Sequence, residues 1–314
     1  MKGLLSQMKQ FLLPSKPPAA AGRGIEAGDW LQCVRRLQEH SARFGNAPCL
    51  LATCNVCGET TAFYCKETPL ARESYLCAGC LTTSRYRSVA RGVLRFFAEE
   101  LGVEASSLRE LRNHRLPRPI RIYDTQLPFA YLTCAYPIPL ELAAIDGVDV
   151  QLSRFRCDDP LGSPIDGKQN VTNQNLERLT FPDGHFDLIL TSDVMEHVRL
   201  DDLAHREIRR VLGDGGAYVF NVPHTREAHE TMHRVVVRDP DDPEQDDYVM
   251  EREYHGDAND PENAALSYRV YGRELDDSLR SLGFDVDYAF YDHSPNAVVN
   301  TELFYCRATR PPAS

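Results

Sequence analysis

The distribution of apolar and polar positions divides the chain into a helical front part and an α/β back part. Apolar residues recur at helical spacing over 28–45, 86–102 and 105–113, which predicts amphipathic helices there. From residue 120 onward short apolar runs alternate with helical patterns, as is typical of a doubly wound sheet. We expect strands at 120–123, 131–135, 170–172, 186–192, 217–222, 284–290 and 303–307, and helices at 201–212 and 272–282.

The same pattern predicts three parts of unequal length. Residues 1–24 form an amphipathic segment and a linker, and 25–115 form a helical region that contains a cysteine-rich stretch. Residues 116–314 form the α/β domain, in which 223–271 is a long insertion rich in His, Asp, Glu and Pro. Connections of that length are uncommon in compact domains unless they serve as lids or binding segments. We therefore expect a lid at 223–271.

Composition and charge narrow the function classes. The net charge of −11 argues against sequence-independent nucleic-acid binding, which needs phosphate-neutralising Lys and Arg. No apolar run approaches the roughly 20 residues that span a bilayer. Residues 1–13 are basic and amphipathic but lack the unbroken apolar core of a signal peptide; we expect them to dock on the protein itself, with weak membrane contact as the alternative. Ten cysteines are too few for a disulfide scaffold at this length, so we expect a cytoplasmic protein.

Four of the cysteines have the spacing of a metal site. Cys54 and Cys57 form one CxxC pair, and Cys77 and Cys80 form another. Each CxxC turn points two thiolates at one centre, and two such turns complete a tetrahedral S4 site for Zn²⁺. Four protein ligands leave no open position, so we expect a structural zinc rather than a catalytic one. Buried free cysteines are the alternative.

Three arginines follow the second cysteine pair at once. Arg85, Arg87 and Arg91 lie in the predicted helix 86–102 or immediately before it. A zinc ion held by four thiolates carries a net negative charge that nearby guanidinium groups can offset. We favour this structural role over contact with an anionic substrate group.

A fifty-residue stretch of the back part resembles class I S-adenosylmethionine-dependent methyltransferases of the type 11 kind. Over 171–223 it has FPDGHFDLI, then MEHV, then a helix ending in RRVL, a GDGG turn and an apolar strand, in the order of that family. The two CxxC pairs, the Arg-rich helix and EYHG at 253–256 resemble a subset of the superfamily that has a zinc ribbon before the sheet. The resemblance implies a Rossmann-like seven-stranded sheet, the cofactor S-adenosyl-L-methionine and methyl transfer.

The resemblance also implies cofactor-binding positions. Ser192 and Asp193 follow the strand at 186–192, whose carboxyl end faces the methyl-transfer site in the family. The segment 123–129 has no glycine where the family has GxGxG, and Ala135 stands where an acidic residue usually binds ribose. Either other groups hold the adenosine, or the domain has lost ordinary methyl transfer. The cofactor contacts that we expect are Asp124, Thr125, Tyr136, Gln174, Asn175, Leu176, Ser192 and Asp193.

Two histidines are candidates for a general base. His224 directly follows the strand at 217–222, and His255 lies in EYHG. A base takes the proton of an attacking hydroxyl, and the unperturbed pKa of histidine near neutrality suits that role. HETMH at 229–233 satisfies HExxH, which on a helix could bind a hydrolytic zinc, but loop histidines are the simpler interpretation.

These observations predict an O-methyltransferase that acts on a hydroxylated small molecule or glycan. The first alternative is a degenerate methyltransferase fold that binds or regulates a partner without methyl transfer. A zinc-ribbon RNA methyltransferase should show a basic face, and a metallohydrolase should hold a second zinc. The oligomeric state is not indicated by the sequence.

Overall fold

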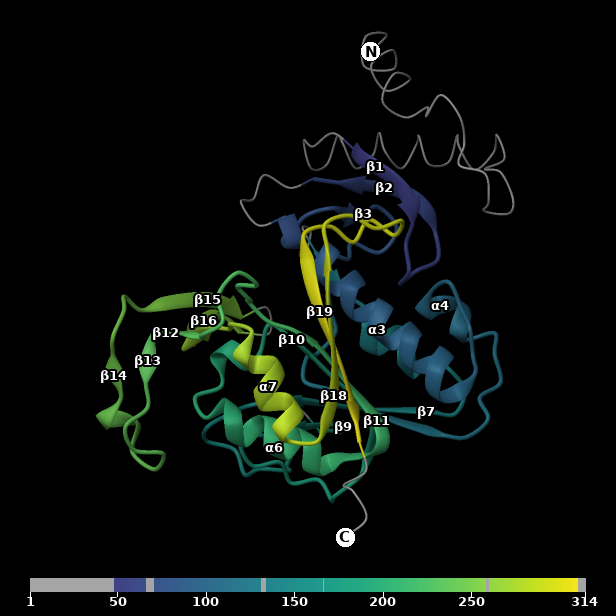
Figure 1. The fold of residues 1–314 in the computed structure, drawn as a ribbon. Coiled ribbons are helices and arrows are strands. Elements are labelled where there is room, and N and C mark those ends of the chain that lie inside the picture. The colour runs from purple at the N-terminus through teal and green to yellow at the C-terminus, as the bar shows by residue number, and fades with distance from the viewer. Residues whose placement is uncertain (1–47, 66–70, 131–133, 166, 258–259, 310–314) are drawn as a thin grey trace.

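The computed structural model describes residues 48–65, 71–130, 134–165, 167–257 and 260–309. The segment expected at 1–24 and the helix expected at 28–45 lie outside these ranges. Figure 1 shows a large sheet with helices on both sides, a small sheet (β1 to β3) near the end of the long strands β18 and β19, and a group of short strands (β12 to β16) at one side.

The large sheet has eight described strands in the order β18-β19-β11-β10-β4-β7-β9-β8. The strands from β11 to β9 run parallel to one another, whereas β19 runs antiparallel between β11 and β18. The expected doubly wound sheet is thus confirmed, with a short extra edge strand. Its strands are β4 (Ile120–Asp124), β7 (Val148–Arg154), β8 (Pro164–Ile165), β9 (Lys168–Asn173), β10 (Phe186–Ser192), β11 (Leu212–Asn221), β18 (Phe284–Tyr291) and β19 (Thr301–Ala308).

The second strand of the sheet is not the one that the sequence predicted. Residues 131–133 lie outside the described ranges, and β6 (Ala135–Tyr136) pairs with β5 (Phe129–Ala130) in a separate hairpin. The true second strand is β7, which pairs with β4 and β9. Residues 148–153 alternate apolar and polar positions strictly, so the sequence carried a strand signal there that our prediction did not use. The residues at the carboxyl end of strand two are therefore Ser153 and Arg154, not Ala135.

Helices cover both faces of the large sheet, and a separate hydrophobic core lies between the sheet and the helices on each face. On one face lie α3 (Ser84–Leu101), α4 (Leu108–Leu111) and α5 (Ile138–Ala143), and on the other lie α6 (Asp201–Val211) and α7 (Glu274–Ser281). In β10, Leu188 and Leu190 join the first core and Ile189 joins the second. This two-sided burial accounts for the continuous apolar run of the strand.

The cysteine-rich segment forms a three-stranded antiparallel sheet of β1 (Pro48–Thr53), β2 (Thr60–Tyr64) and β3 (Leu76–Cys77). The single-turn helix η1 (Ala71–Glu73) precedes β3. Val56 and Phe63 belong to the same buried cluster as the apolar face of α3. The small sheet thus packs on the helix that covers the large one.

The segment expected as a lid consists of short paired strands. β12 (Met232–His233) pairs with β17 (Arg269–Val270), β13 (Val235–Val236) with β14 (Asp247–Tyr248), and β15 (Glu253–Asp257) with β16 (Asp260–Ser267). HETMH is not helical, because its last two residues form β12, so its histidines do not stand one helical turn apart. A short helix, η3 (Pro243–Gln245), lies in the acidic loop. Within the described ranges no helix is long and apolar enough to cross a membrane.

Candidate functional site

The order of the strands creates a switch point between β4 and β10. The chain builds outward from β4 to β7 and β9 in one direction, then returns to β10 and β11 on the other side. Ligands of open α/β sheets bind at the carboxyl ends of the two strands that flank such a point. Those ends carry Asp124 on β4 and Ser192 on β10, and Thr125 bonds across to the carbonyl of Leu190.

Asp124 is fully buried at this point. Its carboxylate accepts hydrogen bonds from the Tyr136 hydroxyl at 2.8 Å and from the Gln126 amide at 3.0 Å. Burial raises the pKa of Asp124 to about 7, although both hydrogen bonds favour the charged form. The group can therefore change its charge near neutral pH.

The loop after β4 fits a bound donor, even though it lacks glycine. Within the part of the chain that the structure describes, Oε1 of Gln126 is buried and accepts no hydrogen bond. A buried acceptor without a donor costs about 1–3 kcal/mol unless a ligand satisfies it. The ammonium and ribose hydroxyl groups of S-adenosylmethionine are donors of the required kind, so the residues present fit this cofactor.

Two arginines from the front part reach the end of β10. Arg72 in η1 contacts Asp193 at 2.6 Å, and Arg85 in α3 donates to the Ser192 hydroxyl at 3.0 Å. Asp193 has a positive φ of 48°, which turns the chain sharply after the strand. Burial alone would raise the pKa of Asp193, but the charges of Arg72 and Arg85 outweigh it and lower the pKa. Asp193 is thus a carboxylate held between two guanidinium groups.

This ion-pair cluster extends to β19 and to η1. Glu302 contacts Arg72 at 2.9 Å, and Glu73 contacts Arg85 at 2.5 Å. Burial raises the pKa of Glu302 to about 7 in spite of the nearby Arg72. Arg85 also contacts Tyr86, whose ring lies 4.7 Å from that of Tyr136. A continuous set of contacts therefore joins Asp124 to Asp193, all of them polar except the ring contact between Tyr86 and Tyr136.

The residues expected to contact adenine follow β9. Gln174 is buried, and its amide bonds to Thr172 and Thr180. Oδ1 of Asn175 accepts from the amide of Glu177, and Leu176 belongs to the core under α6 and α7. At the end of β7, Ser153 bonds to the Tyr123 hydroxyl and provides no carboxylate for ribose. The polar side chains that follow β7 and β9 are thus engaged mainly in internal hydrogen bonds.

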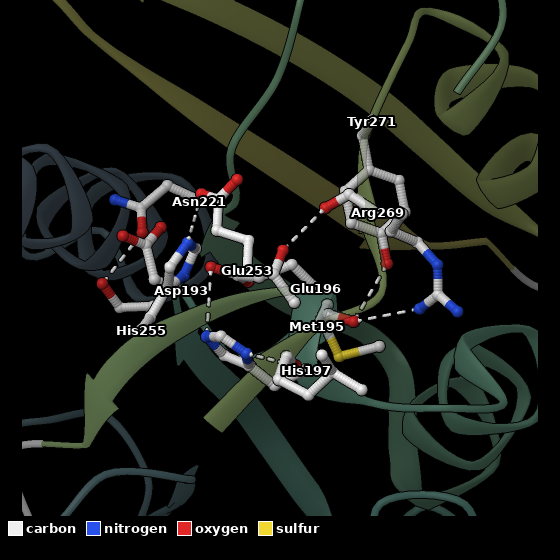
Figure 2. Close-up of polar contacts among 12 residues, drawn as sticks. Asp193, Met195, Glu196, His197, Asn221, Glu253, His255, Arg269 and Tyr271 are labelled. Atoms are coloured by element: carbon white, nitrogen blue, oxygen red, sulfur yellow. Dashed lines mark hydrogen bonds and ion pairs between the residues drawn. The ribbon is translucent and has the colours of Figure 1, made fainter. Parts of the chain in front are cut away.

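The two candidate bases lie in different surroundings. The ring of His224 packs against Tyr288 and Phe304, and neither of its nitrogens has a hydrogen-bond partner among the described residues. Burial lowers the pKa of His224. His255 lies on β15, where its ring is 5.0 Å from that of His197, beside the end of β10 (Figure 2). The structure thus brings only His255 next to the residues that follow Ser192.

His197 and Glu196 lie in the short helix η2 (Met195–His197). Burial, with a contribution from the charge of Asp193, raises the pKa of Glu196 well above its ordinary value. Nδ1 of His197 lies 2.9 Å from the carbonyl of Leu266 on the lid. The lid and the end of β10 therefore meet at η2.

The four cysteines of the two CxxC pairs converge. Cys54, Cys57, Cys77 and Cys80 place their sulfur atoms within 4.8 Å of one another. The sulfur atoms of Cys54 and Cys80 are 3.8 Å apart, as are those of Cys57 and Cys77. Bonds of 2.3 Å to a tetrahedral zinc place thiolates about 3.8 Å apart. The donor set and its spacing thus fit a closed Zn²⁺ site.

Arg87 connects this cysteine cluster to the large sheet. Its buried guanidinium donates to the carbonyls of Tyr75 and Thr82 near the cysteines. It also donates to the carbonyls of Asn296 and Ala297 in the loop between β18 and β19. Arg91 instead stacks on Tyr291. The three arginines thus have separate roles, and Arg85 is the one that reaches the candidate site.

Sequence reasoning missed Arg72 and Glu302. Arg72 lies between the two cysteine pairs, and no local pattern indicated that it would reach β10. Glu302 gave a usable signal, because an acidic residue next to the apolar run Leu303–Cys306 is unusual in a buried strand.

Part of the chain is similar to a known protein family. A family profile described as a methyltransferase domain matches residues 127–220. Comparison with curated proteins finds no match.

Three solved structures illustrate the structural likeness. An S-adenosylmethionine-dependent methyltransferase from Methanosarcina mazei shares 16% identity, covering 62% of this chain and 95% of that chain with a TM-score of 0.38. The [4+2]-cyclase SpnF shares 14% identity, covering 89% of this chain and 95% of that chain with a TM-score of 0.41. The 1,6-didemethyltoxoflavin-N1-methyltransferase of Burkholderia thailandensis shares 15% identity, covering 79% of this chain and 96% of that chain with a TM-score of 0.34. Residues 127–220, which include β7, β9, β10 and most of β11 of the doubly wound sheet, thus match the methyltransferase-domain family.

Proposed function

We propose that the protein is an S-adenosylmethionine-dependent O-methyltransferase that acts on a hydroxylated small molecule or glycan. The observation that carries this proposal is the unsatisfied acceptor of Gln126 beside Asp124 at the switch point of the sheet. Two acceptors, one of them a carboxyl that titrates near neutrality, suit a cofactor that has an ammonium group and two ribose hydroxyls.

The proposed division of the site follows the two strand ends. Asp124 and Gln126 bind the cofactor on the β4 side, and Ser192 and Asp193 line the β10 side. When it is bound, S-adenosylmethionine supplies an electrophilic methyl group. Arg72 and Arg85 fix Asp193 in one position, which keeps the floor of the site rigid.

The acceptor side of the site is formed by η2 and the lid. His255 is partly exposed there, with 34% of its side-chain surface accessible, so an acceptor can reach it. The net charge of −11 favours a neutral or cationic acceptor over RNA. The four cysteines hold a structural zinc in this proposal and take no part in the reaction.

Calorimetric titration with S-adenosylhomocysteine tests the proposal. We expect clear binding to the wild type, and Gln126→Leu should weaken it roughly 10-fold by removing one acceptor. The variant should be as stable as the wild type, or more stable, because the unsatisfied acceptor is gone. Asp183→Asn is the matched control, since Asp183 is 81% exposed and lies on a distant turn.

The outcomes separate the candidate functions. No binding of S-adenosylhomocysteine by the wild type would support the degenerate binding protein and overturn the proposal. Equal binding by the wild type and Gln126→Leu would remove the observation on which it rests. With binding established, mass spectrometry of hydroxylated small molecules and glycans should detect a product about 14 Da heavier than its acceptor.

A further inference from the structure

A carboxylate and two imidazoles converge where the lid meets the end of β10. Glu196, His197 and His255 place one potential ligand atom each within 4.8 Å of one another. Nε2 of His197 lies 3.7 Å from Oε1 of Glu196. Figure 2 shows the two imidazole rings beside Glu196, one from η2 and the other from β15. Atoms bound to one cation at about 2.1 Å are roughly 3.0–3.4 Å apart, so a small inward movement of the lid would complete this geometry.

Both imidazoles are held in the way that metal-binding histidines usually are. Nδ1 of His197 lies 2.9 Å from the Leu266 carbonyl, which can only accept, so this nitrogen carries a proton and Nε2 is the atom on the side of Glu196. Nε2 of His255 lies 2.9 Å from Oε1 of Glu253, which leaves Nδ1 as the lone-pair atom. Glu253 is in turn paired with Arg234. Such outer partners fix the tautomer and orientation of histidine ligands.

The carboxyl group of Glu196 lies beside the ring of His197, at 3.7 Å from Nε2, but accepts no hydrogen bond from another described residue. The residue is 0% exposed, and neither oxygen accepts a hydrogen bond from any described residue. Two buried, unsatisfied carboxylate oxygens are costly in a native structure and call for a ligand. A cation between Glu196 and the two imidazoles would satisfy them.

The backbone that carries Glu196 is held rigidly. The Tyr268 amide donates to the Glu196 carbonyl at 2.8 Å, and the Tyr271 hydroxyl donates to the Met195 carbonyl at 3.2 Å. The buried guanidinium of Arg269 donates to the carbonyls of Val198 and Arg199. η2 is thus a fixed platform, whereas His255 comes from a partly exposed hairpin.

We propose that Glu196, His197 and His255 form a site for a divalent transition-metal cation that binds the acceptor hydroxyl. Two imidazole nitrogens and one carboxylate suit Zn²⁺, Mn²⁺, Fe²⁺ or Co²⁺ better than Mg²⁺, which prefers oxygen ligands. Three protein ligands leave open positions, unlike the closed cysteine site.

The role of the cation rests on the proposed function. A hydroxyl bound to a divalent cation is held in a fixed position and loses its proton more readily. His255 then acts as a ligand rather than as a general base. The substrate class narrows to acceptors whose hydroxyl, alone or with a neighbouring oxygen, can coordinate a cation.

Titration of the purified protein with Mn²⁺, followed by electron paramagnetic resonance, tests the site. Mn²⁺ favours oxygen and nitrogen ligands over thiolates, so the cysteine cluster contributes little to the signal. We expect one bound Mn²⁺ per chain. His255→Ala and Glu196→Gln should each weaken binding by at least about 10-fold. His229→Ala and His233→Ala, which remove exposed histidines of the same lid, are the matched controls and should bind like the wild type.

Two further measurements decide between the explanations. Amide exchange should slow in β15 and β16 on addition of Mn²⁺, because the cation links the hairpin to η2. If wild type binds no Mn²⁺, or if His255→Ala and His229→Ala bind it equally, the cation site is refuted. Because His255 lies on a partly exposed strand, its variant remains informative if Glu196→Gln fails to fold. If the wild type binds S-adenosylhomocysteine but no Mn²⁺, only the cation site is refuted and the proposed function stands. If the wild type does not bind S-adenosylhomocysteine, the proposed function itself is refuted.

Discussion

The buried carboxyl of Asp124 is the most constrained single residue of the site. Burial opposes its ionisation, while the Tyr136 hydroxyl and the Gln126 amide favour it. The balance places its pKa at about 7, compared with 3.8 for an unperturbed aspartate. Between these two values the folded protein holds a proton that the unfolded chain releases, so folding becomes less favourable as the pH rises.

Asp124→Asn should remove this pH dependence. We expect Asp124 alone to lower the stability of the wild type by up to about 4 kcal/mol between about pH 4 and pH 7, because a shift of one unit corresponds to about 1.4 kcal/mol. The variant lacks the titrating group, so its stability relative to the wild type should increase as the pH rises. Urea unfolding at pH 5 and pH 8 without cofactor measures the difference.

Glu302 provides the comparison for this experiment. Its pKa is also raised to about 7, so Glu302 lowers the stability of both the wild type and Asp124→Asn as the pH rises. This contribution cancels when the two proteins are compared. A constant stability difference between the two proteins at pH 5 and pH 8 would contradict the assigned pKa of Asp124. Glu302→Gln should change the pH dependence in the same sense as Asp124→Asn.

At the residue scale, the sequence predicted the positions of single site residues better than the side-chain contacts that they make. Ser192 and Asp193 were predicted at the end of β10 because a strand end next to a helix start is a local pattern. Their arginine partners come from residues more than 100 positions earlier, and no local pattern encodes such a contact. Tyr136 was expected to contact the cofactor, but its described hydrogen bond goes to Asp124.

At the scale of elements, α3 holds the front part against the sheet. Gly92 faces β11, where a Cβ atom would lie 2.3 Å from Cγ1 of Val219 and 3.2 Å from its Cγ2. Val219 is fully buried, so it cannot move aside into solvent. The absence of a side chain at this position allows the close approach of helix and sheet.

Gly92→Ala should therefore be destabilising, although alanine is a better helix former. Overpacking costs about 1–3 kcal/mol, and the gain in helix propensity offsets at most about 1 kcal/mol. Val219→Ala should make room for the new methyl group. The double variant should then be more stable than the sum of the single effects predicts, by about 1 kcal/mol or more. Additive effects in chemical denaturation would show that the two residues do not compete for space.

Elements with a strong period were predictable, and those without one were not. The two-sided apolar run of β10 and the amphipathic faces of α3, α6 and α7 all agree with the sequence to within a few residues. β7 is an exception, because its residues 148–153 alternate apolar and polar positions regularly and our prediction did not use that signal. The paired strands of the lid are two to eight residues long, and their pairing depends on tertiary contacts.

At the scale of the whole molecule, the cysteine cluster and the large sheet share one core and one buried arginine. Arg87 donates to two carbonyls beside the cysteines and to two in the loop between β18 and β19. The Arg87 guanidinium also lies over the ring of Phe63 in β2, 4.6 Å from its centroid, and so contacts the small sheet directly. Loss of the cluster would therefore disturb two of the four carbonyls that accept from this buried charge and loosen the loop that follows β18.

Zinc removal should destabilise more than the small sheet. We expect about one zinc per chain in protein whose cation site has lost its metal during purification. Loss of the cysteine-bound zinc in Cys54→Ser should lower the melting temperature by roughly 10 °C, because structural zinc contributes several kcal/mol of folding free energy. Cys157→Ser is the matched control, since Cys157 is an exposed free thiol. Amide exchange of residues 294–300 should accelerate in Cys54→Ser, and also in Arg87→Met, which should retain its zinc. If exchange there changes in neither variant, the cysteine cluster folds independently of the sheet, and the connection through Arg87 is not what joins them.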